Sequence, residues 1–110
     1  MSNNKQSKRY AKAIGQSRIL IVDDHKNIRL SLKLILEQEG AVVHEAETVK
    51  SGFVSLYVPD ATAKSRLPFD LVLLDLRLPD GSGLDILRKL SEQKHASHVI
   101  VISGEGTTTE

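Results

Sequence analysis

The sequence contains no cysteine, no tryptophan, and only two phenylalanines and two tyrosines. Without cysteine the chain cannot form disulfide bonds, thiolate metal sites or a cysteine nucleophile. No apolar run approaches the roughly 20 residues of a membrane-spanning helix, and no hydrophobic signal segment follows Met1. The formal net charge of +1 gives no strong attraction to nucleic acid or to membranes. We therefore expect a cytoplasmic protein that binds neither of them through this segment.

The rest of the composition is typical of one small globular domain. The chain has 110 residues, of which 40% are hydrophobic and 26% are charged, so it is long enough for one domain and too short for two. Residues 1–17 are polar and basic, which predicts a disordered basic tail. The folded domain is expected over residues 18–110.

Short apolar runs that end at an oxygen-bearing side chain are the main clue to function. The runs are residues 19–22, ending at Asp23 and Asp24, residues 71–74, ending at Asp75, and residues 99–102, ending at Ser103. Apolar runs without alternation are typical of strands buried on both faces of a parallel sheet. Such strands end at one edge of the sheet, where the ligand sites of open α/β folds lie. The sequence therefore predicts that these side chains meet.

Segments with helical periodicity separate the runs. Strands are predicted over residues 19–22, 41–46, 69–74 and 99–102, and helices over residues 26–39, 48–58 and 84–93. Gly40 follows the first predicted helix, where a residue in the left-handed conformation commonly forms the C-terminal cap. Thr48 is a suitable N-cap for the second predicted helix, whereas Gly52 lowers the helix propensity of that segment. Strands that alternate with helices predict an α/β fold, in which helices cover both faces of a doubly wound parallel sheet.

The apolar spacing also predicts which face of the first helix is buried. Ile28, Leu32, Ile35 and Leu36 lie on one face of that helix. Arg29, Lys33 and Glu37 lie off this face.

The acidic residues predict a metal site. Asp23, Asp24 and Asp75 would be ionised at neutral pH, and three close negative charges repel one another unless a cation joins them. Oxygen ligands suit Mg²⁺, beside which a carboxylate can attack phosphorus to form an aspartyl phosphate. The Ser103 hydroxyl can donate a hydrogen bond to that group. Each residue alone has a simpler explanation, because acidic pairs cap helices and lone Asp and Ser residues form turns.

Three segments resemble the receiver domain of bacterial two-component response regulators. They are residues 19–25 (ILIVDDH), 70–84 (DLVLLDLRLPDGSGL) and 99–106 (VIVISGEG). The first is similar to the family's first strand and acidic pair, the second to its phosphorylation segment, and the third to its fourth strand with the Ser/Thr switch residue. The Ser-Gly-x-Gly ending is most similar to receivers fused to AAA+ sigma-54 activators.

The resemblance implies a flavodoxin-like (CheY-like) fold with strand order 2-1-3-4-5. It implies that Asp75 accepts a phosphoryl group from a sensor histidine kinase, and that the domain catalyses only its own phosphorylation and dephosphorylation. It also implies that Mg²⁺ is held by Asp24, Asp75 and the backbone carbonyl of Arg77, and through water by Asp23. Ser103 would bind the phosphoryl group and switch the conformation of the following loop.

The sequence departs from the family pattern in two places. Residues 57–68 form a longer stretch than is usual. The family continues after its switch residue with a fifth strand that bears a lysine, and no such strand precedes Glu110, because Lys89 and Lys94 do not match that position. We therefore expect a receiver truncated after the fourth strand, with the fifth strand and last helices missing. A second copy of the chain in a homodimer could cover the surface that the missing strand and helices would leave exposed.

Three alternatives remain open. The chain could be a degenerate receiver that serves only as a protein-interaction module, because the family lysine is missing. It could be an Mg²⁺-dependent phosphohydrolase, although such enzymes usually place a second acid two residues after the nucleophile, where this chain has Arg77. It could also be a fragment without an independent function.

Overall fold

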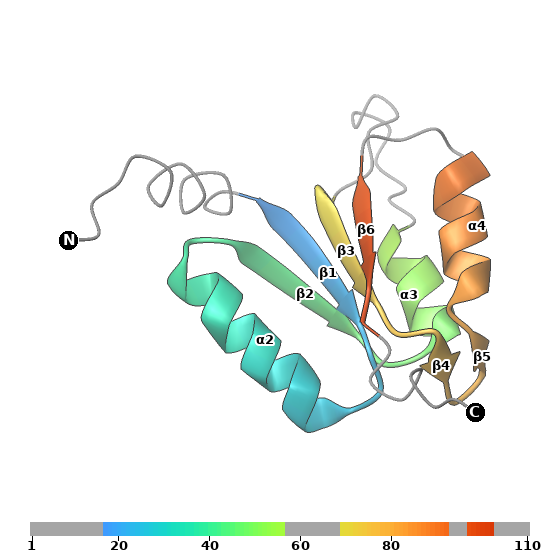
Figure 1. Ribbon diagram of the computed structural model, residues 1–110, viewed down its shortest axis with the longest axis horizontal. Coiled ribbons are helices and arrows are strands. Elements are labelled where there is room, and N and C mark those ends of the chain that lie inside the picture. The colour runs from blue at the N-terminus through green and yellow to red at the C-terminus, as the bar shows by residue number, and fades with distance from the viewer. Residues whose placement is uncertain (1–16, 57–68, 93–96, 103–110) are drawn as a thin grey trace.

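A four-stranded parallel sheet organises the chain (Figure 1). The computed structural model describes residues 17–56, 69–92 and 97–102. In chain order, the elements are β1 (Arg18–Val22), α2 (Lys26–Gln38), β2 (Val42–Ala46), α3 (Val49–Leu56), β3 (Leu71–Leu74), β4 (Arg77–Leu78), β5 (Gly81–Ser82), α4 (Leu84–Glu92) and β6 (His98–Val101). The sheet order is β2-β1-β3-β6, and every strand pair is parallel. This confirms the predicted flavodoxin-like order, in which the first strand lies between the second and the third.

The strand register brings the two acidic motifs to one level of the sheet. Val22 in β1 pairs with Ala46 in β2 and with Leu74 in β3. The Asp23 amide donates to the Ala46 carbonyl at 3.0 Å. The Asp75 amide donates to the Val22 carbonyl at 2.8 Å, so the hydrogen-bond ladder continues beyond the strand ends. Asp23 and Asp75 therefore lie side by side at the carboxyl edge of the sheet.

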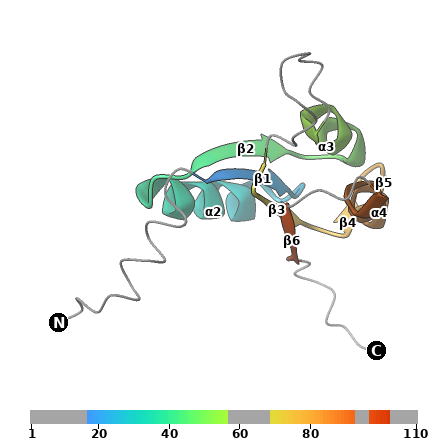
Figure 2. The ribbon, with the colours of Figure 1, turned by 90° about the horizontal axis from the view of Figure 1, so that it is seen from above.

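Helices cover both faces of the sheet, with α2 on one face and α3 and α4 on the other (Figure 2). The buried core toward α3 and α4 consists of Leu20, Val22, Ala46, Val49, Leu56, Phe69, Val72, Leu74, Leu78, Ile86 and Leu90. The smaller cluster toward α2 consists of Ile19, Ile21, Ala41, Val43 and Leu73. Both faces of β1 are thus buried, which explains why an unbroken apolar run rather than an alternating one marks this strand.

The predicted glycine cap of α2 is present. Gly40 has a φ of 95°, and its amide donates to the Glu37 carbonyl at 3.0 Å. The Ala41 amide donates to the Leu36 carbonyl at 3.2 Å. These two bonds form a Schellman motif, which favours glycine because the left-handed position strains a residue that has a Cβ.

The predicted apolar face of α2 is only partly correct. Leu32 and Leu36 pack against the cluster on that side, but Ile28 is 43% exposed and Ile35 is 58% exposed. Arg29, which lies off the predicted apolar face, is only 6% exposed. The reason is that α2 packs on β1 and β2 at one side of the sheet (Figure 1), so its apolar stripe is wider than the surface it covers. Arg29 is buried because it finds polar partners at the sheet edge.

A short antiparallel hairpin follows Asp75, where the sequence predicts only a turn-rich connection. Arg77 in β4 pairs with Ser82 in β5, and Leu78 pairs with Gly81. Strands of two residues are too short for the apolar periodicity to reveal them. The hairpin leads the chain from the end of β3 into α4.

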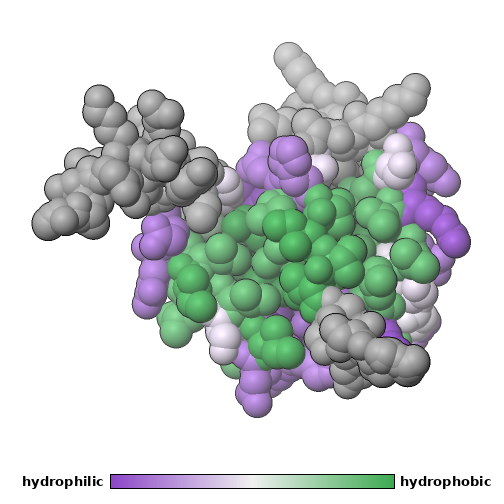
Figure 3. All heavy atoms as spheres, viewed as in Figure 1, coloured by the Kyte–Doolittle hydropathy of each residue, from purple (hydrophilic) through white to green (hydrophobic). Residues whose placement is uncertain are grey.

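Apolar side chains also gather on the surface beside α2 (Figure 3). Ile100 of β6 and Leu34 and Ile35 of α2 are among the exposed large apolar side chains. Among the strands that the structure describes, β6 pairs with β3 alone. No helix in the described ranges is long and apolar enough to cross a membrane.

Three predictions fall outside the described residues. They concern residues 1–16 of the predicted basic tail, the longer stretch over residues 57–68, and the switch residue Ser103. The domain boundary at residue 18 stays a prediction.

Candidate functional site

Three carboxylates and one imidazole meet at the carboxyl edge of the sheet. The ligand atoms offered by Asp23, Asp24, His25 and Asp75 all lie within 4.8 Å of one another. Asp23 and Asp75 are buried, whereas Asp24 and His25 are exposed. β1 and β3 position the buried pair, because each acid directly follows the last residue of its strand. The structure thus brings together the three acids that the sequence singled out.

The surroundings of Asp75 disfavour its charge. Burial raises the pKa of Asp75 above the ordinary value of 3.8, and the carboxylates of Asp23 and Asp24 raise it further. The Arg77 amide donates to Asp75 Oδ1 at 3.0 Å, and this bond and the nearby His25 act in the opposite direction on the pKa. The net shift of the Asp75 pKa is upward, and its largest cause is burial.

A histidine lies among the three carboxylates. The Nδ1 atom of His25 is 2.9 Å from Asp23 Oδ1, 3.3 Å from Asp24 Oδ1 and 3.6 Å from Asp75 Oδ2. The hydrogen bond to Asp23, and then the charge of Asp24, raise the pKa of His25 above 6.5. The His25 amide also donates to Asp23 Oδ1 at 2.8 Å. The sequence interpretation assigned no role to His25, although its place directly after the acidic pair was a signal.

Arg29 holds the loop that carries the acidic pair. Its buried guanidinium donates to the Asp23 carbonyl at 2.8 Å and, through Nε, to Glu45 Oε1 at 2.8 Å. Lys33 Nζ donates to Glu45 Oε2 at 3.1 Å. The hydrogen bonds from Arg29 and Lys33 lower the pKa of Glu45, although its partial burial opposes them. This network ties α2 to β2 and to the backbone of Asp23.

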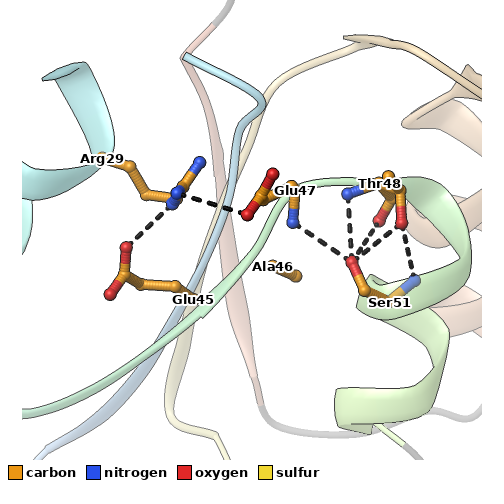
Figure 4. Close-up of a pocket in the computed structure, with 6 residues that line it drawn as sticks. All are labelled: Arg29, Glu45, Ala46, Glu47, Thr48 and Ser51. Carbon is orange, nitrogen blue, oxygen red and sulfur yellow. Dashed lines mark hydrogen bonds and ion pairs between the residues drawn. The ribbon is translucent and has the colours of Figure 1, made fainter. Parts of the chain in front are cut away.

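A pocket of about 390 Å³ lies beside this network (Figure 4). It is lined by Arg29, Glu45, Ala46, Glu47, Thr48 and Ser51. Arg29 pairs with Glu45 and also lies 3.6 Å from Glu47 Oε2 through its Nη2 atom. The positive charge of Arg29 is therefore already neutralised by Glu45 and Glu47. The candidate site for chemistry is the acidic cluster and not this pocket.

Asp80 connects the hairpin after Asp75 to the start of α3. Its Oδ1 accepts from the Val49 amide at 2.7 Å and its Oδ2 from the Lys50 amide at 3.0 Å. The predicted cap is present too, since Thr48 Oγ1 accepts from the Ser51 amide at 2.9 Å. The first amides of a helix have no partner within the helix, so these acceptors stabilise its start. The sequence interpretation missed Asp80, because nothing local places it beside α3.

We expect Asp80→Ala to lower the Tm at neutral pH and to lower it less at strongly acidic pH. The two amide bonds hold the pKa of Asp80 below 3.8. A carboxylate with a depressed folded pKa adds stability that is complete above its unfolded pKa, and loses it as the pH falls through the folded value. Thermal melts followed by circular dichroism at the two pH values would measure the difference.

The matched control is Asp85→Ala. Asp85 is exposed and pairs with Arg88 at 3.3 Å within α4, and exposed pairs of this kind contribute little. Its Tm should change little at either pH. Equal losses of Tm for Asp80→Ala at both pH values would contradict a role for the Asp80 charge.

The donor set fits a hard divalent cation. Asp23, Asp24 and Asp75 offer carboxylate oxygens, which Mg²⁺ prefers, and their charges lack a full counterion. Arg77, whose backbone carbonyl was expected to be a further ligand, is held beside the site by its amide bond to Asp75. Ser103 lies outside the described residues.

Comparison with known proteins gives a consistent result. The response regulator receiver domain family matches residues 19–110. The KDP operon transcriptional regulatory protein KdpE of Escherichia coli is 40% identical over 92 residues, which are 84% of this chain and 37% of KdpE. The chain spans less than two fifths of the length of the curated relatives it matches.

Solved structures agree on the fold. A CheY-like receiver domain protein from Methanospirillum hungatei has a TM-score of 0.69 at 34% identity, over 82% of this chain and 66% of that chain. The response regulator TrrA from Thermotoga maritima, solved in complex with Mg(2+)-BeF, has a TM-score of 0.66 at 31% identity, over 80% of this chain and 70% of that chain.

Proposed function

The chain belongs to the response regulator receiver domain family, a phosphoacceptor module of two-component signal transduction, and we propose that Asp75 is its phosphoacceptor. The observation that carries this proposal is the position of Asp75. It is buried at the end of β3, and its carboxylate lies within 4.8 Å of the ligand atoms of Asp23 and Asp24.

In the proposed reaction, an Asp75 carboxylate oxygen attacks phosphorus. The phosphoryl donor is a phosphohistidine of the sensor kinase. A bond forms between the Asp75 oxygen and phosphorus while the bond from phosphorus to the histidine nitrogen breaks, and the electron pair of that bond stays on the imidazole. The ionised carboxylate is already the nucleophilic form, so no general base is required. The Arg77 amide, 3.0 Å from Oδ1, orients the carboxylate.

Mg²⁺ would be held by Asp24, Asp75 and the Arg77 carbonyl, and through water by Asp23. When bound, it supplies positive charge against the carboxylates and the phosphoryl oxygens. The donor chemistry of the acidic cluster supports this assignment, as does the Mg(2+)-BeF complex of TrrA. We further propose that Ser103 binds the phosphoryl group and moves the loop that follows it.

The proposed donor is a sensor histidine kinase, and the proposed place of transfer is the cytoplasm. The curated relatives KdpE and ResD are named as transcriptional regulatory proteins. Because this chain spans less than two fifths of their length, any effect on transcription is proposed for the whole protein and not for this segment. A homodimer stays a prediction.

Intact-mass spectrometry after treatment with acetyl phosphate tests the proposal. We expect a mass gain of one phosphoryl group in the presence of Mg²⁺ and none in the presence of a chelator. Hydroxylamine should remove the added group, because it cleaves acyl phosphates. No mass gain in protein that melts cooperatively would instead favour a receiver that serves only for protein interaction. Turnover of a phosphomonoester would favour a phosphohydrolase.

A further inference from the structure

His25 occupies the N-cap position of α2 without capping the helix. Its backbone is extended, with φ −86° and ψ 103°, and its side chain makes no cap hydrogen bond. Ser, Thr, Asp and Asn are preferred at this position because their oxygens accept from the free amides of the first turn. The imidazole is therefore not explained by the stability of α2. Its Nδ1 atom instead faces the carboxylates of Asp23, Asp24 and Asp75.

The distances from His25 Nδ1 to these carboxylates are close to those between neighbouring ligands of one divalent ion. Ligands about 2.1 Å from an ion lie about 3.0 Å apart when adjacent in octahedral coordination, and about 3.4 Å apart in tetrahedral coordination. The distances from His25 Nδ1 to the three carboxylate oxygens are 2.9, 3.3 and 3.6 Å. The His25 side chain is 49% exposed, and its Nδ1 atom is hydrogen-bonded to Asp23 Oδ1.

We propose that His25 Nδ1 is a direct ligand of the metal site formed by Asp23, Asp24 and Asp75, and that it makes this site favour a divalent transition ion, from Mn²⁺ to Zn²⁺, over Mg²⁺. Mg²⁺ takes oxygen ligands, whereas imidazole binds ions of the first transition row well. The inference rests on the proposed function, because it uses the same carboxylates, but it concerns the identity of the ion and not the transfer of the phosphoryl group.

Metal titrations of the intact chain test this assignment. Binding of Co²⁺ is followed by its visible absorption, and binding of Mg²⁺ by competition with Co²⁺. We expect His25→Ala to weaken Co²⁺ at least about tenfold and to change the Kd for Mg²⁺ by no more than about twofold. The matched control is His98→Ala. His98 is an exposed histidine at the amino end of β6, at the opposite edge of the sheet, so its loss should change neither Kd.

A second measurement detects a coordinated nitrogen directly in the wild-type chain, so its decisive result does not depend on the folding of a variant. Electron spin echo spectroscopy of Mn²⁺ bound to the wild-type chain should show modulation from a coordinated imidazole nitrogen. The modulation should remain in His98→Ala and disappear in His25→Ala. Wild-type protein that binds Mn²⁺ without nitrogen modulation would overturn the inference.

The outcomes separate this inference from the proposed function. Equal changes in the two Kd values for His25→Ala would overturn the role of His25 alone. Tighter Mg²⁺ binding by His25→Ala would also overturn it, because the imidazole would then be a cation that competes with the metal. Failure of the wild-type chain to bind either ion would overturn the shared metal site, whereas failure of phosphorylation with intact metal binding would overturn only the proposed function.

Discussion

Replacing Asp75 with asparagine is expected to abolish phosphoryl incorporation completely and, at the same time, to raise the Tm of the metal-free chain at neutral pH. The amide cannot act as the nucleophile, so no acyl phosphate forms. Asparagine has nearly the same shape but carries no charge. It therefore removes a buried carboxylate that is penalised by its burial and repelled by Asp23 and Asp24.

The gain in stability should depend on pH. Because the folded pKa of Asp75 is raised above 3.8, the folded chain binds more protons than the unfolded chain between the two pKa values. The stability of the wild-type chain therefore falls as the pH rises through that interval, and the penalty persists above the folded pKa. Below the unfolded pKa the wild-type carboxyl is neutral as well, and the two chains should melt at similar temperatures.

Intact mass after acetyl phosphate treatment and thermal melts in chelator would measure the two effects. Mg²⁺ should raise the Tm of the wild-type chain more than that of Asp75→Asn, because the variant has lost a ligand. Asp85→Asn, which changes an exposed aspartate of α4, serves as the control and should keep both the mass gain and the wild-type Tm. A mass gain in Asp75→Asn equal to that of wild type would rule out Asp75 as the phosphoacceptor.

Gly83→Ala is expected to destabilise the fold by about 3 kcal/mol, because the new methyl group has no room. A Cβ at this position would overlap the backbone carbonyl oxygen of Asp75 and would lie 3.1 Å from Leu76 Cα. Backbone atoms in a packed strand end cannot move aside as a side chain can. The Gly83 amide also donates to the Leu76 carbonyl at 2.9 Å, which holds the two segments together.

Gly52→Ala is the matched control, because it also adds a methyl group to a buried glycine. There the Cβ would lie 2.7 Å from Ile86 Cδ1, the end of a side chain that can rotate, and 3.5 Å from Val22 Cγ1. Alanine also favours the helical conformation by about 1 kcal/mol over glycine, so we expect a change within about 1 kcal/mol of wild type. Urea unfolding of both variants would measure the difference. A Gly83→Ala chain as stable as wild type would show that the Asp75 backbone can move.

The local signals in the sequence predicted most of the elements. The unbroken apolar runs identified β1 and β3, because burial on both faces removes the alternation that a half-exposed strand would show. The run at residues 99–102 also marked a strand, but the expected burial was wrong there, since Ile100 and Val101 of β6 are 51% and 45% exposed. Gly40 and Thr48 marked helix ends correctly, because caps depend on the backbone of adjacent residues. The hairpin of β4 and β5 was missed, because strands of two residues have no period to detect.

Only part of the site was predictable from the sequence. The residues at the strand ends could be predicted, whereas their contacts with residues distant in the sequence could not. The acids that follow β1 and β3 could be placed together because parallel strands share one carboxyl edge. The partners that adjust the site come from elsewhere. Arg29 lies off the predicted apolar face of its helix, yet it is buried against the Asp23 carbonyl and Glu45, and that contact exists only once α2 lies on the sheet.

The sequence by itself determined the main strands and helices, the helix caps and the acidic residues at the sheet edge, because each depends on local apolar pattern, backbone preference or chain direction. The strand order was implied by the family resemblance. The tertiary structure alone decided that Asp80 caps α3, that Gly83 lies against the Asp75 backbone and that His25 Nδ1 lies near the Asp75 carboxylate. These contacts join different segments of the chain over a few ångströms. Such distances are set by how the helices and the hairpin pack against the sheet.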